Sequence, residues 1–400
     1  MFGCALAVAL AAPAPARAQR GKSPWGQILI VDSPSDEGVD LYDPASNRFA
    51  PKPATPRMKT RYRATATLLV NGPNAGKVLV AGGGNRKHIA RASTELYDPA
   101  TNTVVPGPPM HIPREGHVAA AIAYGHNAGK ILIAGGRDAG NHRLPSTELY
   151  DPDANTFSPG PAMGVTCDHH PATMIAAGKN AGKILITGCY DFRGQTGLTE
   201  LYDPAGDKFI AGPRTNMLDV FTATAIPSGK NTGKILIVGA IDTTSQKLLA
   251  LTGLYDPDAN TFSPGPAMKN IRRGHTATVI TSGPRAGKIL IAGGGDFFDD
   301  SPSLASTEFY DPGTNAFAPG PSMNTGRENY TATVILSGEN AGNILIAGGI
   351  KRDGKGGLDM FSSSELYDSA TNSFAPGSEM NWSRFNAVAV QLPPASVRPH

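Results

Sequence analysis

The stretch Ser146-Thr-Glu-Leu-Tyr-Asp-Pro-Asp-Ala-Asn-Thr-Phe157 decides the fold, because similar stretches occur seven times in this chain of 400 residues. Each copy is centred on Leu-Tyr-Asp-Pro or a close variant, and the core tyrosines are Tyr42, Tyr97, Tyr150, Tyr202, Tyr255, Tyr310 and Tyr367. Neighbouring core tyrosines are 52 to 57 residues apart. A period of this length predicts an array of similar supersecondary units that stack on one another.

Each repeat divides into four short apolar or β-branched segments, which we predict to be antiparallel strands. The first strand resembles residues 275–280, the second 288–294, the third 146–150 and the fourth 155–157. Asn-Ala-Gly-Lys turns join the first and second strands, and Asp-Pro-x-x-Asn turns join the third and fourth. Asn and Gly tolerate the positive φ of tight turns, and Pro presets φ near −65°.

The two ends of the chain predict how the array closes. The first apolar segment, residues 27–31, has the pattern of a second strand, whereas the last, residues 385–392, has that of a first strand. Pairing of these two segments would remove two open sheet edges and complete a circle. The sequence therefore predicts an all-β, seven-bladed β-propeller with four antiparallel strands per blade, closed by the C-terminal strand on the N-terminal blade.

The repeat resembles the kelch family: Gly-Gly follows the second strand, Tyr lies in the third and an aromatic residue in the fourth. The fourth-strand aromatic is Phe where kelch repeats usually have Trp, and one blade has Val104. The seven-bladed propeller of galactose oxidase is the architecture that the chain is similar to. This resemblance implies a scaffold and does not by itself imply an activity.

The N-terminus has an apolar segment followed by Ala16-Arg17-Ala18, which is typical of a signal-peptide cleavage site. We expect residues 1–18 to be a signal peptide and residues 19–400 to form one propeller, so that the protein is secreted or periplasmic. Cys4 as a lipid attachment site is an alternative, although the preceding residues do not form a lipobox. No later apolar run is long enough to span a bilayer as a helix.

Composition limits the partners. The formal net charge is +3, and the Lys and Arg residues are scattered, so we expect no nucleic-acid partner. The chain has no Walker loop, no Cys-x-x-Cys and no His-Glu-x-x-His motif, so we expect no cofactor and no metal. We also expect a monomer.

The two faces of the ring differ in sequence. The Asn-Ala-Gly-Lys and Asp-Pro-x-x-Asn turns lie on one face, which we name the turn face. The connections from second to third and from fourth to first strands lie on the other, the variable-loop face. Its loops vary in length and content: 84–92, 137–145, 190–198, 241–251, 296–305 and 350–362. Variable loops on a rigid scaffold are the expected place for binding.

Arginines precede several first strands on the variable-loop face, at Arg61, Arg114, Arg272 and Arg327, with Cys167, Leu218 and Trp382 at the corresponding places. Polar residues follow the second strands at Asn85, Asp138, Asp191, Asp242 and Asp296. One interpretation is an arginine-lined mouth that binds an anionic or polyhydroxylated ligand. The other is that Arg–Asp pairs and Asx turns brace the blades.

A shared position at the head of the first strands holds His117, His170, His275 and Tyr330, with Phe221 and Phe385 in two other blades. The three histidines and Tyr330, together with Asp168 and the four arginines, are our candidate ligand-binding residues. Packing is the more common role of such an aromatic position, and catalytic histidine is the alternative. No catalytic residue is identified.

Cys167 precedes a first strand and Cys189 follows the neighbouring second strand, so both lie at one end of a predicted hairpin. A disulfide is our first expectation, because an exported protein folds in an oxidising compartment. Free thiols are an alternative, and a metal site with Asp168, His169 and His170 is another, although adjacent residues of a strand point to opposite faces.

Two functional hypotheses follow. The first is a secreted binding scaffold that presents its variable loops to a protein or carbohydrate partner. The second is a carbohydrate-active enzyme with a site at the channel entrance, similar to the kelch-type sugar mutarotases or copper sugar oxidases. An enzyme requires several polar groups to converge in a pocket, which sequence alone does not show.

Overall fold

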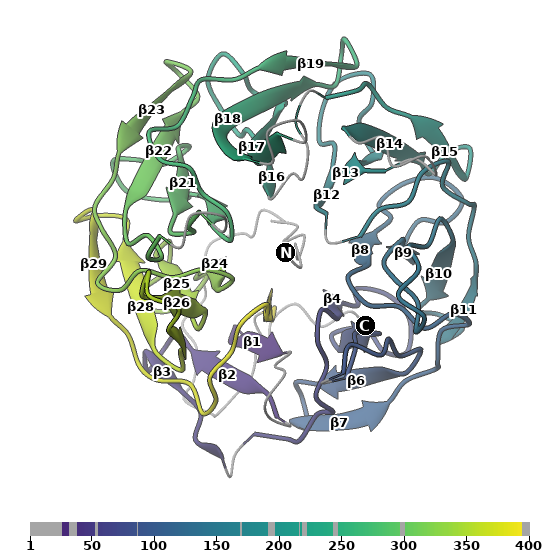
Figure 1. Cartoon of the computed structure of the whole chain (residues 1–400). Helices are drawn as coiled ribbons and strands as arrows, with labels where there is room; N and C mark the ends of the chain where they lie inside the picture. The colour runs from purple at the N-terminus through teal and green to yellow at the C-terminus, as the bar shows by residue number, and fades with distance from the viewer. Residues whose placement is uncertain are drawn as a thin grey trace.

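Seven four-stranded antiparallel sheets stand around one axis, each with its innermost strand next to the central channel (Figure 1). This computed structural model describes residues 26–31, 38–52, 55–85, 87–168, 170–190, 197–215, 217, 222–242, 247–296 and 301–393. The expected signal peptide lies outside the described residues. The seven-bladed all-β propeller is confirmed, and no helix in the described part of the chain is long and apolar enough to cross a membrane.

The blades are numbered along the chain, with strands given from the inside outward. Blade 1 contains β30 (Val388–Gln391), β1 (Ile28–Val31), β2 (Asp40–Asp43) and β3 (Arg48–Phe49). Blade 2 contains β4 (Thr65–Leu68), β5 (Val78–Ala81), β6 (Thr94–Asp98) and β7 (Thr103–Pro106). Blade 3 contains β8 (Val118–Ala121), β9 (Ile131–Ala134), β10 (Thr147–Asp151) and β11 (Thr156–Pro159). Blade 4 contains β12 (Ala172–Met174), β13 (Ile184–Cys189), β14 (Leu198–Asp203) and β15 (Lys208–Ala211).

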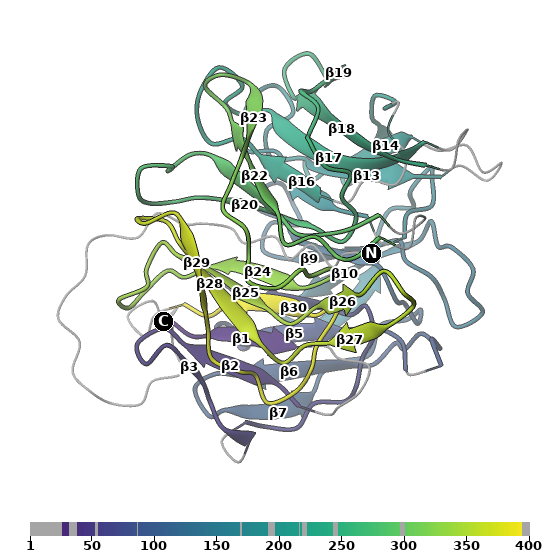
Figure 2. The ribbon, with the colours of Figure 1, turned by 60° about the vertical axis from the view of Figure 1, so that its left-hand side comes forward.

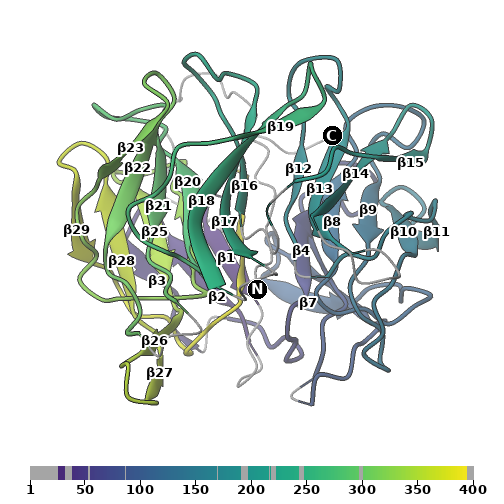
Figure 3. The same cartoon turned by 45° about the horizontal axis from the view of Figure 1, so that its top comes forward.

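The remaining blades follow the same order. Blade 5 contains β16 (Thr222–Ala225), β17 (Ile235–Asp242), β18 (Lys247–Asp256) and β19 (Thr261–Pro264). Blade 6 contains β20 (Thr276–Val279), β21 (Ile289–Ala292), β22 (Thr307–Asp311) and β23 (Ala316–Pro319). Blade 7 contains β24 (Thr331–Val334), β25 (Ile344–Ala347), β28 (Ser364–Asp368) and β29 (Ser373–Pro376). An extra hairpin, β26 (Ile350–Arg352) with β27 (Leu358–Met360), extends blade 7 on the variable-loop face (Figure 3).

The chain closes as the sequence predicted. β30 pairs antiparallel with β1 over four residues, from Ile28 opposite Gln391 to Val31 opposite Val388. β30 also contacts the innermost strands of both neighbouring blades, β24 and β4. The C-terminal strand therefore occupies the first-strand place of the N-terminal blade, next to β1 in two views (Figures 1 and 2).

The hydrophobic core is divided into seven clusters, and each cluster lies between two neighbouring blades. The core tyrosines are fully buried, and each donates its hydroxyl hydrogen to an Asn or Asp five residues later, as Tyr150 does to Asn155 at 2.8 Å. Asn155 has φ of 53°, a left-handed conformation that Asn adopts more readily than most residues. The repeated Leu-Tyr-Asp-Pro-x-x-Asn pattern therefore serves both the turn and the packing between blades.

Two expected loops contain strands instead. Residues 241–251 were expected to be a loop, yet β17 and β18 continue into this segment, with Ile241 opposite Leu248. Residues 350–362 contain the β26–β27 hairpin. Both expectations were wrong because they placed the strand ends at the Gly-Gly position or its equivalent, whereas antiparallel pairing continues or resumes beyond it.

We predict that a chain ending at Ala387 loses the stability of the ring. It lacks β30, so Leu29 and Val31 lose their packing with Val388 and Val390, and one edge of β1 loses its hydrogen bonds. Scanning calorimetry should show a Tm lower by about 10 °C or more, or no cooperative unfolding. A control chain ending at Pro393 retains β30 and should unfold like the full chain; equal Tm values for the two truncations would contradict the closure.

Candidate functional site

Short pairs of residues continue the inner strands onto the variable-loop face. Tyr62 pairs with Gly84, Glu115 with Arg137 and Thr166 with Tyr190, each as an isolated antiparallel bridge. These pairs place the residues that precede a first strand beside those that follow the second strand of the same blade. The candidate site is therefore built from side chains held by a β-ladder at the base of the loops.

The four predicted arginines do not line an open mouth. Arg61, Arg114, Arg272 and Arg327 are 0–1% exposed. Arg272 is representative: it forms an ion pair with Glu308 of the third strand at 3.1 Å and donates from Nη1 to the carbonyl oxygens of Gly293 and Ser306. Each arginine thus joins the connection from the preceding blade to the second and third strands of its own blade.

The bracing interpretation of these arginines is correct, but the predicted partners were wrong. The acceptor is a third-strand glutamate, as in Arg61–Glu95, Arg114–Glu148 and Arg327–Glu365. Among the polar residues that follow the second strands, Asn85 and Asp138 instead accept backbone N–H groups two and four residues later. Asp191 lies outside the described residues. Because side chains alternate along a strand, the third-strand glutamate faces the arginine. The Asx turns lie in the loops that follow the second strands, where Asn and Asp cap nearby backbone N–H groups.

The positions predicted for the last repeat, Trp382 and Phe385, were wrong. The residue at the arginine position of the last repeat is Arg384 and not Trp382. Arg384 is 1% exposed and pairs with Asp40 of β2 at 2.5 Å. The residue at the shared aromatic position is accordingly Ala387 and not Phe385. The four-residue spacing from a buried Met to the arginine, as in Met268 and Arg272 or Met323 and Arg327, was the signal that identifies Arg384 from Met380.

The shared aromatic position is a packing position between blades. His117 Nε2 lies 2.9 Å from Thr65 Oγ1 of the preceding blade, and His275 Nε2 lies 3.2 Å from Thr222 Oγ1. Tyr330 donates to the carbonyl oxygen of Ala292 at 2.5 Å. Burial, assisted by nearby arginines, lowers the pKa of His117 and of His275 from 6.5 to about 3, so both rings are neutral at physiological pH.

His170 lies at the same position in blade 4 and is also buried, with its ring 5.7 Å from that of Tyr190. Its neighbour His169 and the fifth-blade residues Leu218 and Phe221 lie outside the described residues. In the parts of the chain that the structure describes, no three His, Cys, Asp or Glu side chains come together as a metal-binding group. The histidines at this position are therefore distributed around the ring, one to a blade.

Blade 4 replaces the buried arginine with a disulfide. Cys167 and Cys189 are joined by a disulfide, with Cα atoms 4.5 Å apart, and both residues are buried. The third-strand glutamate, Glu200, remains. Glu200 Oε1 accepts a hydrogen bond from the Gly164 N–H at 2.8 Å, whereas Oε2 has no hydrogen-bond partner among the described residues. Burial raises the pKa of Glu200 from 4.5 to about 7.

Blade 5 departs from the repeat at both the arginine position and the third-strand glutamate position. Leu218 stands where the arginine is expected, and the third-strand glutamate is replaced by Gly253. A Cβ atom at Gly253 would lie 2.8 Å from Met217 Sδ, so methionine fills the space of the missing carboxylate. The paired loss in blade 5 indicates that arginine and glutamate act as a unit, which makes the retained Glu200 of blade 4 exceptional.

A second set of charged residues lies on the variable-loop face of blades 2, 3 and 4. We name it the three-blade network: Arg63, Glu115, Arg137, Arg143 and Asp168. The two carboxylates are buried, with side chains 4–5% exposed, whereas the three arginines are 16–37% exposed. Arg137 and Arg143 each donate from Nε to Asp168 at 2.6 Å, and Arg63 lies 3.6 Å from Glu115.

Aromatic rings support the guanidinium groups of this network. The Cζ atom of Arg143 lies 4.1 Å from the ring centre of Tyr190, and that of Arg63 lies 4.7 Å from the ring centre of Tyr62. Burial raises the pKa of Glu115, although Arg63, His88 and Arg137 oppose this shift. Buried carboxylates and stacked rings thus fix the orientation of three partly exposed cations.

Only Asp168 of the candidate ligand-binding residues belongs to the three-blade network. Arg63, Arg137 and Arg143 were not predicted from the sequence, because they do not recur at one position of the repeat. That irregularity was itself the available signal, since residues that bind a ligand on a symmetric scaffold are those that break its repeat. The disulfide flanks the network directly, because Asp168 follows Cys167 and Tyr190 follows Cys189.

Comparison with known proteins agrees with the geometry. The Kelch motif model matches residues 123–164 and 272–324, and no curated protein matches the chain significantly. Among solved structures, the fold is similar to that of YjhT, with 12% identity, a TM-score of 0.54, and coverage of 81% of this chain and 99% of that one. The chain is a kelch-repeat β-propeller.

A fungal alcohol oxidase of the AA5 family, solved in complex with copper, is also similar in fold. The identity is 17% and the TM-score 0.57, with coverage of 81% of this chain and 67% of the oxidase chain. Identities this low show a common architecture only. They do not transfer an activity to this chain.

We predict that Glu200 makes stability depend on pH. The folded state holds a proton on Glu200 up to about pH 7, whereas the unfolded state releases it near 4.5, so the free energy of unfolding falls as pH rises through this window. The fall amounts to up to about 3 kcal/mol. Glu200→Gln should remove it and be neutral or stabilising at pH 8, as measured by denaturant unfolding across pH.

Glu308→Gln is the matched control, because Glu308 occupies the same place in blade 6 and is paired with Arg272. It should destabilise the protein by about 3 kcal/mol at pH 7, since it leaves a buried guanidinium without its carboxylate. Equal effects of the two substitutions would contradict the different states of the two glutamates.

We predict that the disulfide can be exchanged for the clamp found in the sister blades. The double variant Cys167→Arg with Cys189→Gly recreates the Arg and Gly-Gly sequence of blades 3 and 6, and the new arginine should pair with Glu200. Its Tm should not change with reductant, whereas reduction should destabilise the original chain by about 3 kcal/mol. If the variant is no more stable than a Cys167→Ala, Cys189→Gly control, blade 4 cannot accommodate the clamp.

Proposed function

We propose that the chain is an exported binding module that recognises anionic groups of a carbohydrate or protein partner through the variable-loop face of its propeller. Export is supported by the apolar leader with Ala16-Arg17-Ala18 and by the disulfide, because disulfides persist in oxidising compartments. The binding surface is supported by the charge arrangement on one face of the ring.

The three-blade network is the observation that carries this proposal. The guanidinium groups of Arg137 and Arg143 are partly exposed and held in place by Asp168, so they need little reordering when a ligand binds. Arg143 uses Nε on Asp168 and stacks on Tyr190, and within the described residues its two Nη groups have no hydrogen-bond acceptor. Forked donors of this kind fit carboxylate, sulfate or phosphate groups.

The loops above the network supply the variable part of the surface. Loops 84–92 and 137–145 begin at the ladder pairs that include Gly84 and Arg137, and both contain Asx turns that fix their conformation. On the turn face, by contrast, the repeated Lys and Asp side chains pair with each other, as Lys130 does with Asp151. Partly exposed arginines that are held by buried carboxylates therefore gather on the variable-loop face.

The enzyme hypothesis is supported only by likeness of fold to a copper-containing alcohol oxidase. Of the residues that the sequence offered for such a site, His117, His275 and Tyr330 are buried between blades and contact neighbouring threonines or main chain. His170 is buried beside the ring of Tyr190. We therefore argue the binding function.

An array of acidic and neutral glycans, followed by affinity measurement, tests this proposal. Arg143→Ala and Arg137→Ala should each weaken binding of acidic glycans by about tenfold or more with little change in Tm, because each removes a partly exposed donor group and leaves Asp168 paired with the other arginine. Lys179→Ala is the control, since Lys179 is exposed on the turn face. Absence of any acidic ligand, or equal binding by the arginine variants, would overturn the proposal; an acidic protein captured with the same arginine dependence would assign the protein alternative.

A further inference from the structure

Blade 6 breaks the repeat on the turn face at Arg285. The corresponding turns of other blades have Asn, whose side-chain amide donates to the core tyrosine of the next blade: Asn180 to Tyr255 at 2.9 Å, and Asn231 to Tyr310 at 3.0 Å. Arg285 replaces this inter-blade link. The hydroxyl group of Tyr367 in blade 7 still donates to Asn372 in the turn of its own blade.

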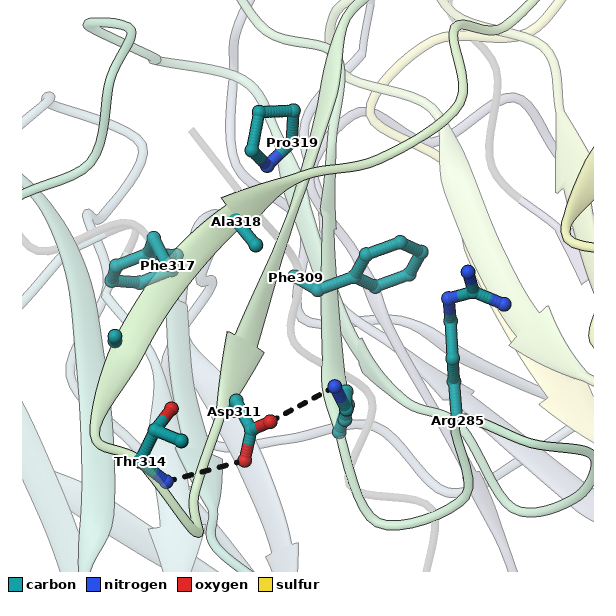
Figure 4. Close-up of a pocket in the computed structure, with 9 residues that line it drawn as sticks. Arg285, Phe309, Asp311, Thr314, Phe317, Ala318 and Pro319 are labelled. Carbon is teal, nitrogen blue, oxygen red and sulfur yellow. Dashed lines mark hydrogen bonds and ion pairs between the residues drawn. The ribbon is translucent and has the colours of Figure 1, made fainter.

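A second departure lies next to the first. Phe309 occupies the third-strand position that is leucine in the other six blades, at Leu41, Leu96, Leu149, Leu201, Leu254 and Leu366. The Cζ atom of Arg285 lies 5.3 Å from the ring centre of Phe309. Both side chains extend to the same side of the blade, as Figure 4 shows.

These two residues help to line a pocket of about 220 Å³, together with the outer strand β23. Phe309, Ala316, Phe317, Ala318 and Pro319 supply apolar surface. The rings of Phe309 and Phe317 lie on opposite sides of the strand β23 (Figure 4). The volume is below the roughly 300 Å³ at which pockets begin to hold drug-sized ligands, so it suits one small ring.

Among the described residues that line the pocket, Lys288 is paired with a carboxylate and Arg285 is not. Lys288 and Asp311 pair at 2.9 Å, as the corresponding residues do in four other blades, and Asp311 also accepts from the Gly313 and Thr314 backbone N–H groups. The Arg285 side chain contacts the Phe309 ring and forms no hydrogen bond or ion pair within the described residues. Its guanidinium therefore offers forked donors beside apolar surface, which is the arrangement that recognises a carboxylate attached to a ring.

We propose that this pocket on the turn face is a separate binding site for a small ring compound that carries a carboxylate. The carboxylate pairs with Arg285, and the ring lies against Phe309 and Pro319. The proposal does not depend on the three-blade network, which belongs to blades 2 to 4 on the opposite face.

Titration with benzoate, followed by NMR line shifts and calorimetry, tests this site in the full chain. We expect saturable binding with a Kd of about 1 mM, as suits a ligand of this size. Arg285→Asn should weaken it about tenfold or more, and Phe309→Leu about threefold or more. Both substitutions restore the residue found in sister blades, so the fold is retained; Arg285→Asn should also reform the link to Tyr367 and leave Tm unchanged or higher.

Three further probes separate the contributions. Benzamide, which lacks the charge, and sulfate, which lacks the ring, should each bind at least about tenfold more weakly than benzoate. Arg143→Ala should leave benzoate binding unchanged, so that failure here and failure of the variable-loop proposal are distinguishable. Sulfate binding as strong as benzoate, unsaturable benzoate shifts, or wild-type affinity in Arg285→Asn would each overturn the proposal.

Discussion

The pairing of β30 with β1 is the constraint on which the rest of this structure depends. Four residue pairs hold the last strand beside the first, and Val388 and Val390 complete the cluster between blades 1 and 2. In an open array the end blades would expose a sheet edge and an apolar face. Closure removes both, and it allows every blade to be buried by two neighbours, which is why the seven inter-blade clusters together replace a single central core.

Within that ring, buried arginines hold the inner connections in place. An arginine that pairs with a third-strand glutamate and two main-chain carbonyl groups satisfies polar atoms which the turn between blades leaves inside the protein. Blade 1 uses Asp40 and Arg384, blade 5 has lost the glutamate, and blade 4 substitutes a covalent bond. The exception in blade 4 adjoins the three-blade network, so the part of the ring with the altered connection also carries the partly exposed cations.

The repeat itself was readable from the sequence because spacing and turn chemistry report it directly. The number of blades, the strand pattern and the closure follow from the places of Tyr, Gly and Asn along the chain. The disulfide between Cys167 and Cys189 was the first of three expectations, and it rested on the place of both residues at one end of a hairpin. The orientation of the arginines was not readable, because an arginine before a strand can point into a blade or out of the ring, and only the third-strand glutamate decides between them. Arg384 was missed because the alignment placed Trp382 at the arginine position and did not use the four-residue spacing from Met380 to the arginine.

One junction in the ring differs from the other six. At the turn face of blade 1, no turn connects β30 to β1, whereas a four-residue turn connects the corresponding strands of the other blades. The Gly26 N–H instead donates a hydrogen bond to the Pro393 carbonyl oxygen at 3.0 Å. The fold therefore does not require the chain ends to lie in blade 1. A circular permutant that bridges Pro393 and Gly26 with Asn-Ala-Gly-Lys and opens another blade at its own turn would preserve every strand pair, and the topology allows the polypeptide to start in any of the seven sectors.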